Sequence, residues 1–237
     1  MMLTEKLAGR KRLIAVFDTE TTGVDVESDR IITAYVGVLD PDGEVIDGRE
    51  WLINPGVPIP VAASRIHGVD DERAAGGDDP RDALASIVGE LRELSAAGVP
   101  IVGHNVSYDL TILVWECARY NLEAYTPTSV IDTLVLDKHV DPYRKGSRRL
   151  TTTAQHYKVP LTSAHDASAD AVAAGRVAQA IRTQYPYTIG KSLEELHTNQ
   201  IKWDSEQRLS FQKYMQRDDP TFTAEVGWPI RESASLF

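Results

Sequence analysis

The first acidic pair of the chain, Asp18 and Glu20, could bind a cation. Both residues close an apolar run that begins at Leu13 and predicts a strand. Side chains two positions apart on a strand point to the same face, so the two carboxylates would lie side by side. Taken alone, the pair is more simply explained as a solvated strand end.

Two further carboxylates, Asp109 and Asp170, lie on apolar faces of the helices predicted over 108–120 and 167–182. Their apolar neighbours at helical spacing are Ile112, Leu113, Cys117 and Tyr120 in the first helix, and Ala174, Val177 and Ile181 in the second. An inward carboxylate is costly unless it is paired or binds a metal. A surface Asp that interacts with the helix dipole is the usual alternative, but two inward carboxylates on separate helices indicate one shared ligand.

This set of oxygen ligands indicates Mg²⁺ or Mn²⁺. Cys117 is the only cysteine, so an internal disulfide is excluded and a thiolate metal site is not expected. Four carboxylates can hold two ions, and two ions roughly 3.5–4 Å apart suit phosphodiester cleavage. His165, five residues before Asp170, could accept a proton from water, because the pKa of histidine is ordinarily about 6.5. A lone histidine is more often a packed or exposed side chain.

The composition bounds the class of protein. The chain has 237 residues, of which 42% are hydrophobic and 25% charged, as in a soluble α/β domain. No run approaches the roughly 18 apolar residues that span a membrane, and a reducing, cytoplasmic location is expected. The net charge of −10 leaves two interpretations open: an acidic protein without a polyanion partner, or a carboxylate site whose bound cations meet phosphate.

The hydrophobic pattern predicts the elements that position these residues. Strands are expected over 13–18, 30–39, 44–53, 101–103 and 130–132, and helices over 80–97, 108–120, 150–157, 167–182 and 193–217. Asp79-Pro80 and Ser192 to Glu195 provide helix-start signals. The proline-rich segment 54–79 is expected to be a loop. A meander followed by alternating strands and helices predicts an α/β fold with a mixed sheet flanked by helices.

Three segments resemble the exonuclease motifs of the DEDDh, or DnaQ-like, 3′→5′ exonuclease superfamily. They are FDTETTG (17–23), VGHNVSYDLTIL (102–113) and AHDASADA (164–171), and they occur in the family's order. IHGV (66–69) and Ile131-Asp132-Thr133 resemble two lesser signatures. The opening motif is closer to that of proofreading-type members than to that of the oligoribonucleases, and the resemblance covers roughly residues 12–185.

The resemblance implies a ribonuclease-H-like fold with a mixed five-stranded sheet. It divides the chain into an N-terminal tail (1–11), an exonuclease domain (12–185) and a helical C-terminal extension and tail (186–237). The extension is expected to pack on the catalytic domain; docking of a partner or a second copy is the alternative.

The resemblance also implies roles for individual residues. The metal-binding carboxylates would be Asp18, Glu20, Asp109 and Asp170, with His165 as general base. Substrate-binding positions would be Thr19, Thr21, Thr22, Gly23, His67, Asn105 and Tyr108. Two departures stand out: Tyr108 replaces a common Phe, and Ala62 stands where the family often has a Glu that holds the terminal nucleotide.

The implied activity is a two-metal-dependent release of nucleoside 5′-monophosphates from nucleic-acid 3′ ends, using Mg²⁺ or Mn²⁺. Single-stranded or frayed DNA is the expected substrate. The alternatives are an RNA-trimming exoribonuclease and a non-catalytic nucleic-acid-binding or scaffold module. The latter is disfavoured because all five catalytic positions are filled.

Two segments bear on partners. The basic stretch 138–149 could follow a nucleic-acid backbone, with Tyr143 stacking on a base, or could be a solvated loop. The terminal residues Ser-Ala-Ser-Leu-Phe (233–237) partly resemble the peptide by which bacterial replication proteins bind the sliding clamp. A clamp or a polymerase is therefore a possible partner, and no membrane is expected.

Overall fold

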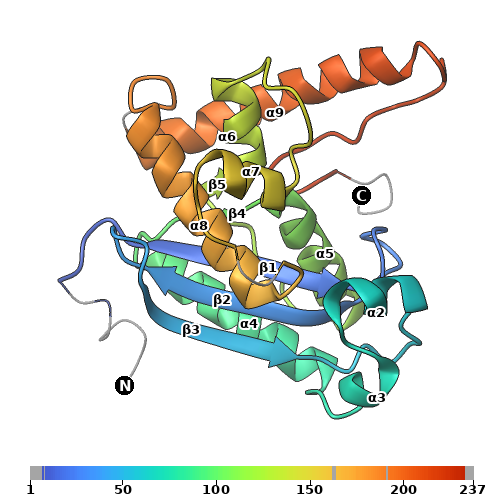
Figure 1. Cartoon of the computed structure of the whole chain (residues 1–237). Coiled ribbons are helices and arrows are strands. Elements are labelled where there is room, and N and C mark those ends of the chain that lie inside the picture. The colour runs from blue at the N-terminus through green and yellow to red at the C-terminus, as the bar shows by residue number, and fades with distance from the viewer. Residues whose placement is uncertain (1–6, 8, 162–163, 191, 233–237) are drawn as a thin grey trace.

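The computed structural model describes residues 7, 9–161, 164–190 and 192–232. Its centre is a five-stranded sheet in the order β3-β2-β1-β4-β5 (Figure 1). The strands are β1 (Ile14–Thr21), β2 (Ile31–Leu39), β3 (Val45–Leu52), β4 (Ile101–Gly103) and β5 (Val130–Asp132). The first three are antiparallel, whereas β4 and β5 run parallel to β1. The predicted mixed five-stranded sheet is confirmed.

Helices cover both faces of this sheet. They are α2 (Val61–His67), α3 (Asp71–Ala74), α4 (Pro80–Ala96), α5 (Val106–Arg119), α6 (Thr133–Val140), α7 (Leu150–His156), α8 (Ala167–Gln184) and α9 (Leu193–Met215). In Figure 1, α8 crosses one face of β1 and β2, and α4 lies behind the sheet. Among the described residues, none of these helices combines the length and apolar character needed to cross a membrane.

The two strongest helix-start predictions are confirmed by their caps. The Asp79 carboxylate accepts hydrogen bonds from the backbone N–H groups of Arg81 and Asp82 at the start of α4. The Ser192 hydroxyl accepts one from the Glu195 N–H at the start of α9, at 3.1 Å. Both caps satisfy amide groups that have no partner within the first turn of a helix.

The predicted loop over residues 54–79 is wrong, because the segment contains α2 and α3. Its prolines precede the helix instead of breaking it, and Pro60 is the N-cap residue of α2. A small apolar cluster holds both helices against β2: Ile32, Ile59, Ala63, Val69 and Ala74. Residues 59, 63, 69 and 74 are too irregularly spaced in the sequence to predict a helix. Ile32, the fifth member, lies on strand β2.

The basic stretch 138–149 is partly an internal structure. Arg144 and Arg148 both bind the buried Asp137 carboxylate, at 2.6 and 2.7 Å. Burial opposes ionisation there, yet the two arginines hold the pKa of Asp137 below its usual value. Tyr143 is 91% exposed. Two of the five cations in this stretch therefore stabilise the fold instead of facing solvent.

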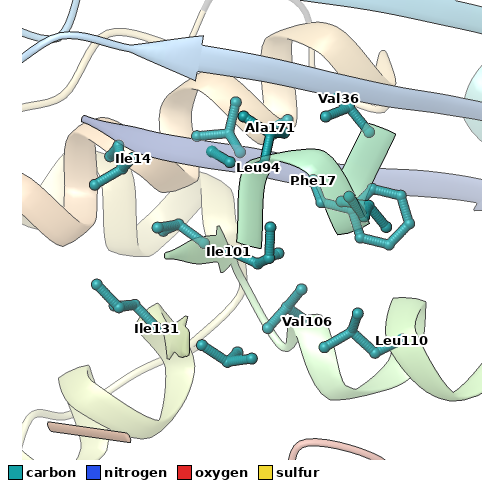
Figure 2. Close-up of a cluster of buried hydrophobic side chains, with 14 of the residues drawn as sticks. Ile14, Phe17, Val36, Leu94, Ile101, Val106, Leu110, Ile131 and Ala171 are labelled. Atoms are coloured by element: carbon teal, nitrogen blue, oxygen red, sulfur yellow. The ribbon is translucent and has the colours of Figure 1, made fainter. Parts of the chain in front are cut away.

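The main hydrophobic core lies between the sheet and the helices (Figure 2). Side chains from β1, β2, β4 and β5 meet those of α4, α5 and α8, including Ile14, Phe17, Val36, Leu94, Ile101, Val106, Leu110, Ile131 and Ala171. Leu196 and Trp203 of α9 belong to the same core. The C-terminal extension therefore packs on the rest of the chain, as predicted. Residues 233–237, with the clamp-like peptide, lie outside the described residues.

Gly175 lets α8 approach the sheet closely. A Cβ at this position would lie 2.5 Å from Val16 Cγ1 and 2.6 Å from Leu39 Cδ1. Real Cβ atoms do not approach so closely, so the Val16 and Leu39 side chains or α8 itself would have to shift.

We expect Gly175→Ala to lower the free energy of unfolding by about 1–3 kcal/mol, because it overpacks this contact. Gly89→Ala is the matched control, since Gly89 lies in α4 with nothing within 4 Å of an added Cβ. That change should stabilise the protein by about 0.5–1 kcal/mol through helix propensity. Urea denaturation of both variants measures the difference, and effects of the same sign would contradict the close approach of α8.

Candidate active site

The end of β1 presents acidic side chains toward α8. Alternation along the strand places Asp18 and Glu20 on the face that carries Val16, whose methyl group lies against α8. Asp170 lies in the first turn of α8. Glu20, His165 and Asp170 each offer a ligand atom, and these three atoms lie within 4.8 Å of one another. The structure thus brings together residues from two distant motifs.

Asp109 approaches the same strand from α5. One of its carboxylate oxygens accepts hydrogen bonds from Thr19 N–H at 3.0 Å and from the Thr19 hydroxyl at 2.6 Å. Asp109 and Thr19 are both buried. Burial and the charge of Asp109 are the two largest causes that raise the pKa of Asp18, so the two carboxylates share one site. Thr19 therefore anchors a carboxylate here, and its predicted contact with a nucleotide stays a prediction.

Asp170 is held by the turn that precedes α8. His165 has a left-handed backbone, with φ of 68°, and its N–H donates to Asp170 Oδ2 at 3.0 Å. The other oxygen, Oδ1, is buried and has no hydrogen-bond partner among the described residues. The His165 side chain is exposed. One carboxylate oxygen is thus left for a ligand, and an imidazole lies next to it.

The carboxylates destabilise one another's charged forms. Burial is the largest cause in each case: the pKa of Asp18 is well above its usual value, and those of Glu20 and Asp109 are about 7. Burial also raises the pKa of Asp170. Every charged neighbour that shifts Asp18 or Glu20 is itself acidic. Clustered oxygen donors that repel one another in this way fit divalent metal ions.

The turn after β1 is braced by hydroxyl groups. Tyr108 donates to the Gly23 carbonyl at 2.6 Å and lies 2.9 Å from the Thr21 hydroxyl. The Thr21 hydroxyl also donates to the Gly23 carbonyl. The buried Thr22 hydroxyl donates to Asp29 at 2.7 Å. Burial raises the pKa of Tyr108 to about 12, so the phenol stays protonated and can donate.

His67 and Asn105, two further predicted substrate-binding residues, lie at the end of α2 and at the N-cap of α5. The His67 Nδ1 accepts the Val69 N–H at 3.2 Å, so its Nε2 carries the proton. That Nε2 is buried without a hydrogen-bond partner among the described residues. Burial, Arg73 and His165 lower the pKa of His67, which keeps the ring neutral. Asn105 has a left-handed backbone, and its N–H donates to Asp132 at 2.9 Å. Ala62 is exposed on α2.

Residues 15–178 match the family model of the RNase T type, described as "Exonuclease". The chain belongs to this exonuclease family. The identification with the DEDDh-type superfamily, made from the three motifs, is thereby confirmed.

Relatives of this exonuclease include two bacterial DNA polymerases III of PolC type. The protein from Lacticaseibacillus paracasei is 36% identical over 169 residues, which cover 71% of this chain and 11% of that protein. The one from Listeria innocua is 33% identical over 163 residues, or 69% and 11%. This exonuclease chain thus spans about a tenth of these polymerases.

Solved structures of exonuclease I share the fold. An Escherichia coli exonuclease I complex with a dT13 oligonucleotide gives a TM-score of 0.62 at 22% identity, covering 73% of this chain and 42% of that one. A zinc-bound E. coli complex with single-stranded DNA gives 0.63 at 22%, covering 74% and 41%. The enzyme from Methylocaldum szegediense gives 0.62 at 22%, also covering 74% and 41%. These likenesses confirm the predicted ribonuclease-H-like fold.

One residue of the exonuclease site, Asp166, was not predicted. It caps α8 by accepting hydrogen bonds from Ser168 and Ala169 N–H, and hydrogen bonding from the Ser168 side chain lowers its pKa. Its charge therefore persists and raises the pKa of Asp18 and Glu20. The helix-start rule for Asp could have identified it, because it immediately precedes α8.

The metal-free protein should lose stability as pH rises. Between about pH 4 and 7 the folded state keeps protons on Glu20 and Asp109 that the unfolded chain has released, so the free energy of unfolding falls. We expect a loss of several kcal/mol, because each pKa unit corresponds to about 1.4 kcal/mol, and hence a fall in Tm of roughly 10 °C or more.

Thermal denaturation in EDTA across this pH range measures the loss. Asp170→Asn removes the charge that, after burial, does most to raise the pKa of Glu20, and it should flatten the decline. A Tm that rises from pH 5 to 8 in the wild-type protein would contradict the mutual repulsion.

Tyr108→Phe removes only the hydroxyl that braces the turn. We expect a loss of about 1 kcal/mol in the free energy of unfolding, since the Gly23 carbonyl loses its phenolic donor. The KM of the exonuclease should rise more than its kcat falls, because the turn is loosened while the carboxylates remain in place. Urea denaturation and steady-state kinetics test both effects; unchanged KM with reduced kcat would argue against this role.

Proposed function

We propose that this chain is a 3′→5′ exonuclease that hydrolyses the terminal phosphodiester bond and releases nucleoside 5′-monophosphates. DNA with a single-stranded or frayed 3′ end is the proposed substrate. The observation that carries the proposal is the convergence of Asp18, Glu20, Asp109 and Asp170 beside an exposed His165. The family membership agrees with it.

Asp18, Glu20 and Asp170 would hold two Mg²⁺ or Mn²⁺ ions, with Asp109 completing the set. When bound, the two ions neutralise the carboxylates, activate water and stabilise the oxygen that leaves. Thr19 fixes the orientation of Asp109 through its two hydrogen bonds. The His165 N–H does the same for Asp170.

His165 would accept the proton of the attacking water at an imidazole nitrogen. Its exposed side chain can pass that proton to solvent after each turnover. The neutral His67 presents an Nε2–H donor that would bind an oxygen of the terminal nucleotide. A histidine base of this kind contributes typically 10²–10⁴-fold to the rate.

The comparisons support DNA as the substrate. Solved exonuclease I structures contain single-stranded DNA, including the oligonucleotides dT13 and dA16, and the relatives in sequence are DNA polymerases. A polymerase is therefore the partner that we propose. The acidic net charge of −10 favours reliance on such a partner, because a basic surface usually supplies affinity for nucleic acid.

We expect Asp18→Ala or Asp170→Ala to abolish stepwise shortening of 5′-labelled single-stranded DNA in Mg²⁺ or Mn²⁺. His165→Ala should lower kcat by roughly 10²–10⁴-fold while Mn²⁺ binding, measured by calorimetry, persists. Mismatched duplex DNA and RNA run in parallel identify the preferred strand.

Asp42→Ala is the control, because Asp42 is exposed in the turn between β2 and β3. It should cleave as the wild type does, and EDTA should stop both. Full activity in Asp18→Ala would refute the mechanism. Binding of nucleic acid without cleavage of any strand would instead favour a non-catalytic module.

A further inference from the structure

Arg231 is a buried arginine in the C-terminal segment, beyond the residues that match the exonuclease family. It is 5% exposed. Its Nη1 donates to Asp204 Oδ2 of α9 at 2.8 Å, and its Nη2 donates to the Ser107 hydroxyl of α5 at 2.5 Å. Its backbone N–H donates to the Thr111 hydroxyl at 2.9 Å. One residue thus joins α9 to α5.

The start of α5 depends on such outside support. Its N-cap residue, Asn105, is left-handed and makes no side-chain capping bond. First-turn amides without a cap leave a helix end free to fray. Ser107 and Thr111 lie one turn apart on one face of α5. Asp109, two positions from each of them in the sequence, lies on the opposite face. Fraying of this turn would move Asp109 away from Thr19.

A second contact from α9 reaches the same helix start. The Gln200 side chain accepts the Asp132 N–H at 2.7 Å and donates to the Val130 carbonyl at 2.8 Å. Gln200 is fully buried. Its side-chain amide forms hydrogen bonds with the backbone of the edge strand β5, as a neighbouring strand would. Asp132 in turn accepts the Asn105 N–H at 2.9 Å. The path therefore runs from α9 through β5 to the first residue before α5.

We propose that Arg231 and Gln200 make the C-terminal segment a positioning element of the nuclease site. Arg231 holds one face of the first turn of α5, while Thr19 holds Asp109 on the other side of that turn. Arg231 touches no reacting group and acts through the placement of Asp109. The effect on activity rests on the proposed function, whereas the effect on α5 does not.

Arg208 provides a matched control. It also binds Asp204, at 3.1 and 3.0 Å, but it makes no bond to α5. Arg208→Gln and Arg231→Gln therefore each remove one arginine from the same carboxylate. Both should lower the Tm, and only Arg231→Gln should disturb α5.

The kinetic arm compares the two variants at a temperature where circular dichroism shows both folded. We expect Arg231→Gln to lower kcat on the order of tenfold, since displacement of a catalytic group by about 1 Å can cost 10²-fold. It should also raise the Mn²⁺ concentration for half-maximal activity several-fold. Arg208→Gln should match the wild type in both quantities.

The second arm is amide hydrogen exchange, which needs no activity. Exchange at residues 106–111 should become faster in Arg231→Gln but not in Arg208→Gln, with α8 as internal reference. Ser107→Ala removes only the hydroxyl that Arg231 contacts, so it should give a smaller change of the same sign without threatening the fold.

The two arms separate the possible failures. A wild-type protein that cleaves no nucleic acid refutes the proposed function, while the exchange data still test the positioning of α5. Equal exchange, kcat and Mn²⁺ requirement in Arg231→Gln and Arg208→Gln would overturn the inference.

Discussion

Repulsion among carboxylates at the end of β1 is the constraint around which the site is built. Asp18 is surrounded by acidic groups on β1, α5 and α8, and each of them makes its charged form less favourable. Neutral donors, the Thr19 hydroxyl and the N–H groups of Thr19 and His165, hold two of these carboxylates without cancelling their charge. Like charges held together in this way carry a cost that a bound proton or a bound cation offsets. Under the proposed function, the fold would thus give up stability for metal affinity.

The two helices that carry the outer carboxylates are positioned by different means. Helix α8 begins with a local cap, Asp166, and packs tightly on β1 and β2 because Gly175 has no side chain. Helix α5 begins at a left-handed residue without a side-chain cap. Its position is set by hydrogen bonds from β1, β5 and the C-terminal segment. Asp170 is thus positioned mainly by residues near it in the sequence, whereas Asp109 is positioned by contacts with residues far from it in the sequence.

This difference explains what the sequence could predict. The strands, α4, α8 and the four carboxylates follow from periodicity and caps within a few residues. Helices α2 and α3 were missed because they depend on packing against Ile32, which lies on another strand. The contact between Arg231 and Ser107 joins residues 124 positions apart, and a single arginine outside any predicted helix or strand gives no local signal. Arg144 and Arg148 were counted as free cations because their partner, Asp137, is recognisable only once it is buried.

Because Arg144 and Arg148 form ion pairs inside the fold, they contribute less to the binding of a nucleic acid by this acidic chain. Affinity from surface cations grows with the number of phosphates that they neutralise, and it weakens steeply with salt. With Arg144 and Arg148 bound to Asp137, the stretch 138–149 offers fewer such contacts than its composition implies. Under the proposed function, binding then depends on the 3′ end of the nucleic acid: divalent ions would lie between the carboxylates and the terminal phosphate, and a neutral donor such as His67 would add a hydrogen bond. Such a site recognises an end in preference to a long backbone, which is the selectivity that an exonuclease requires.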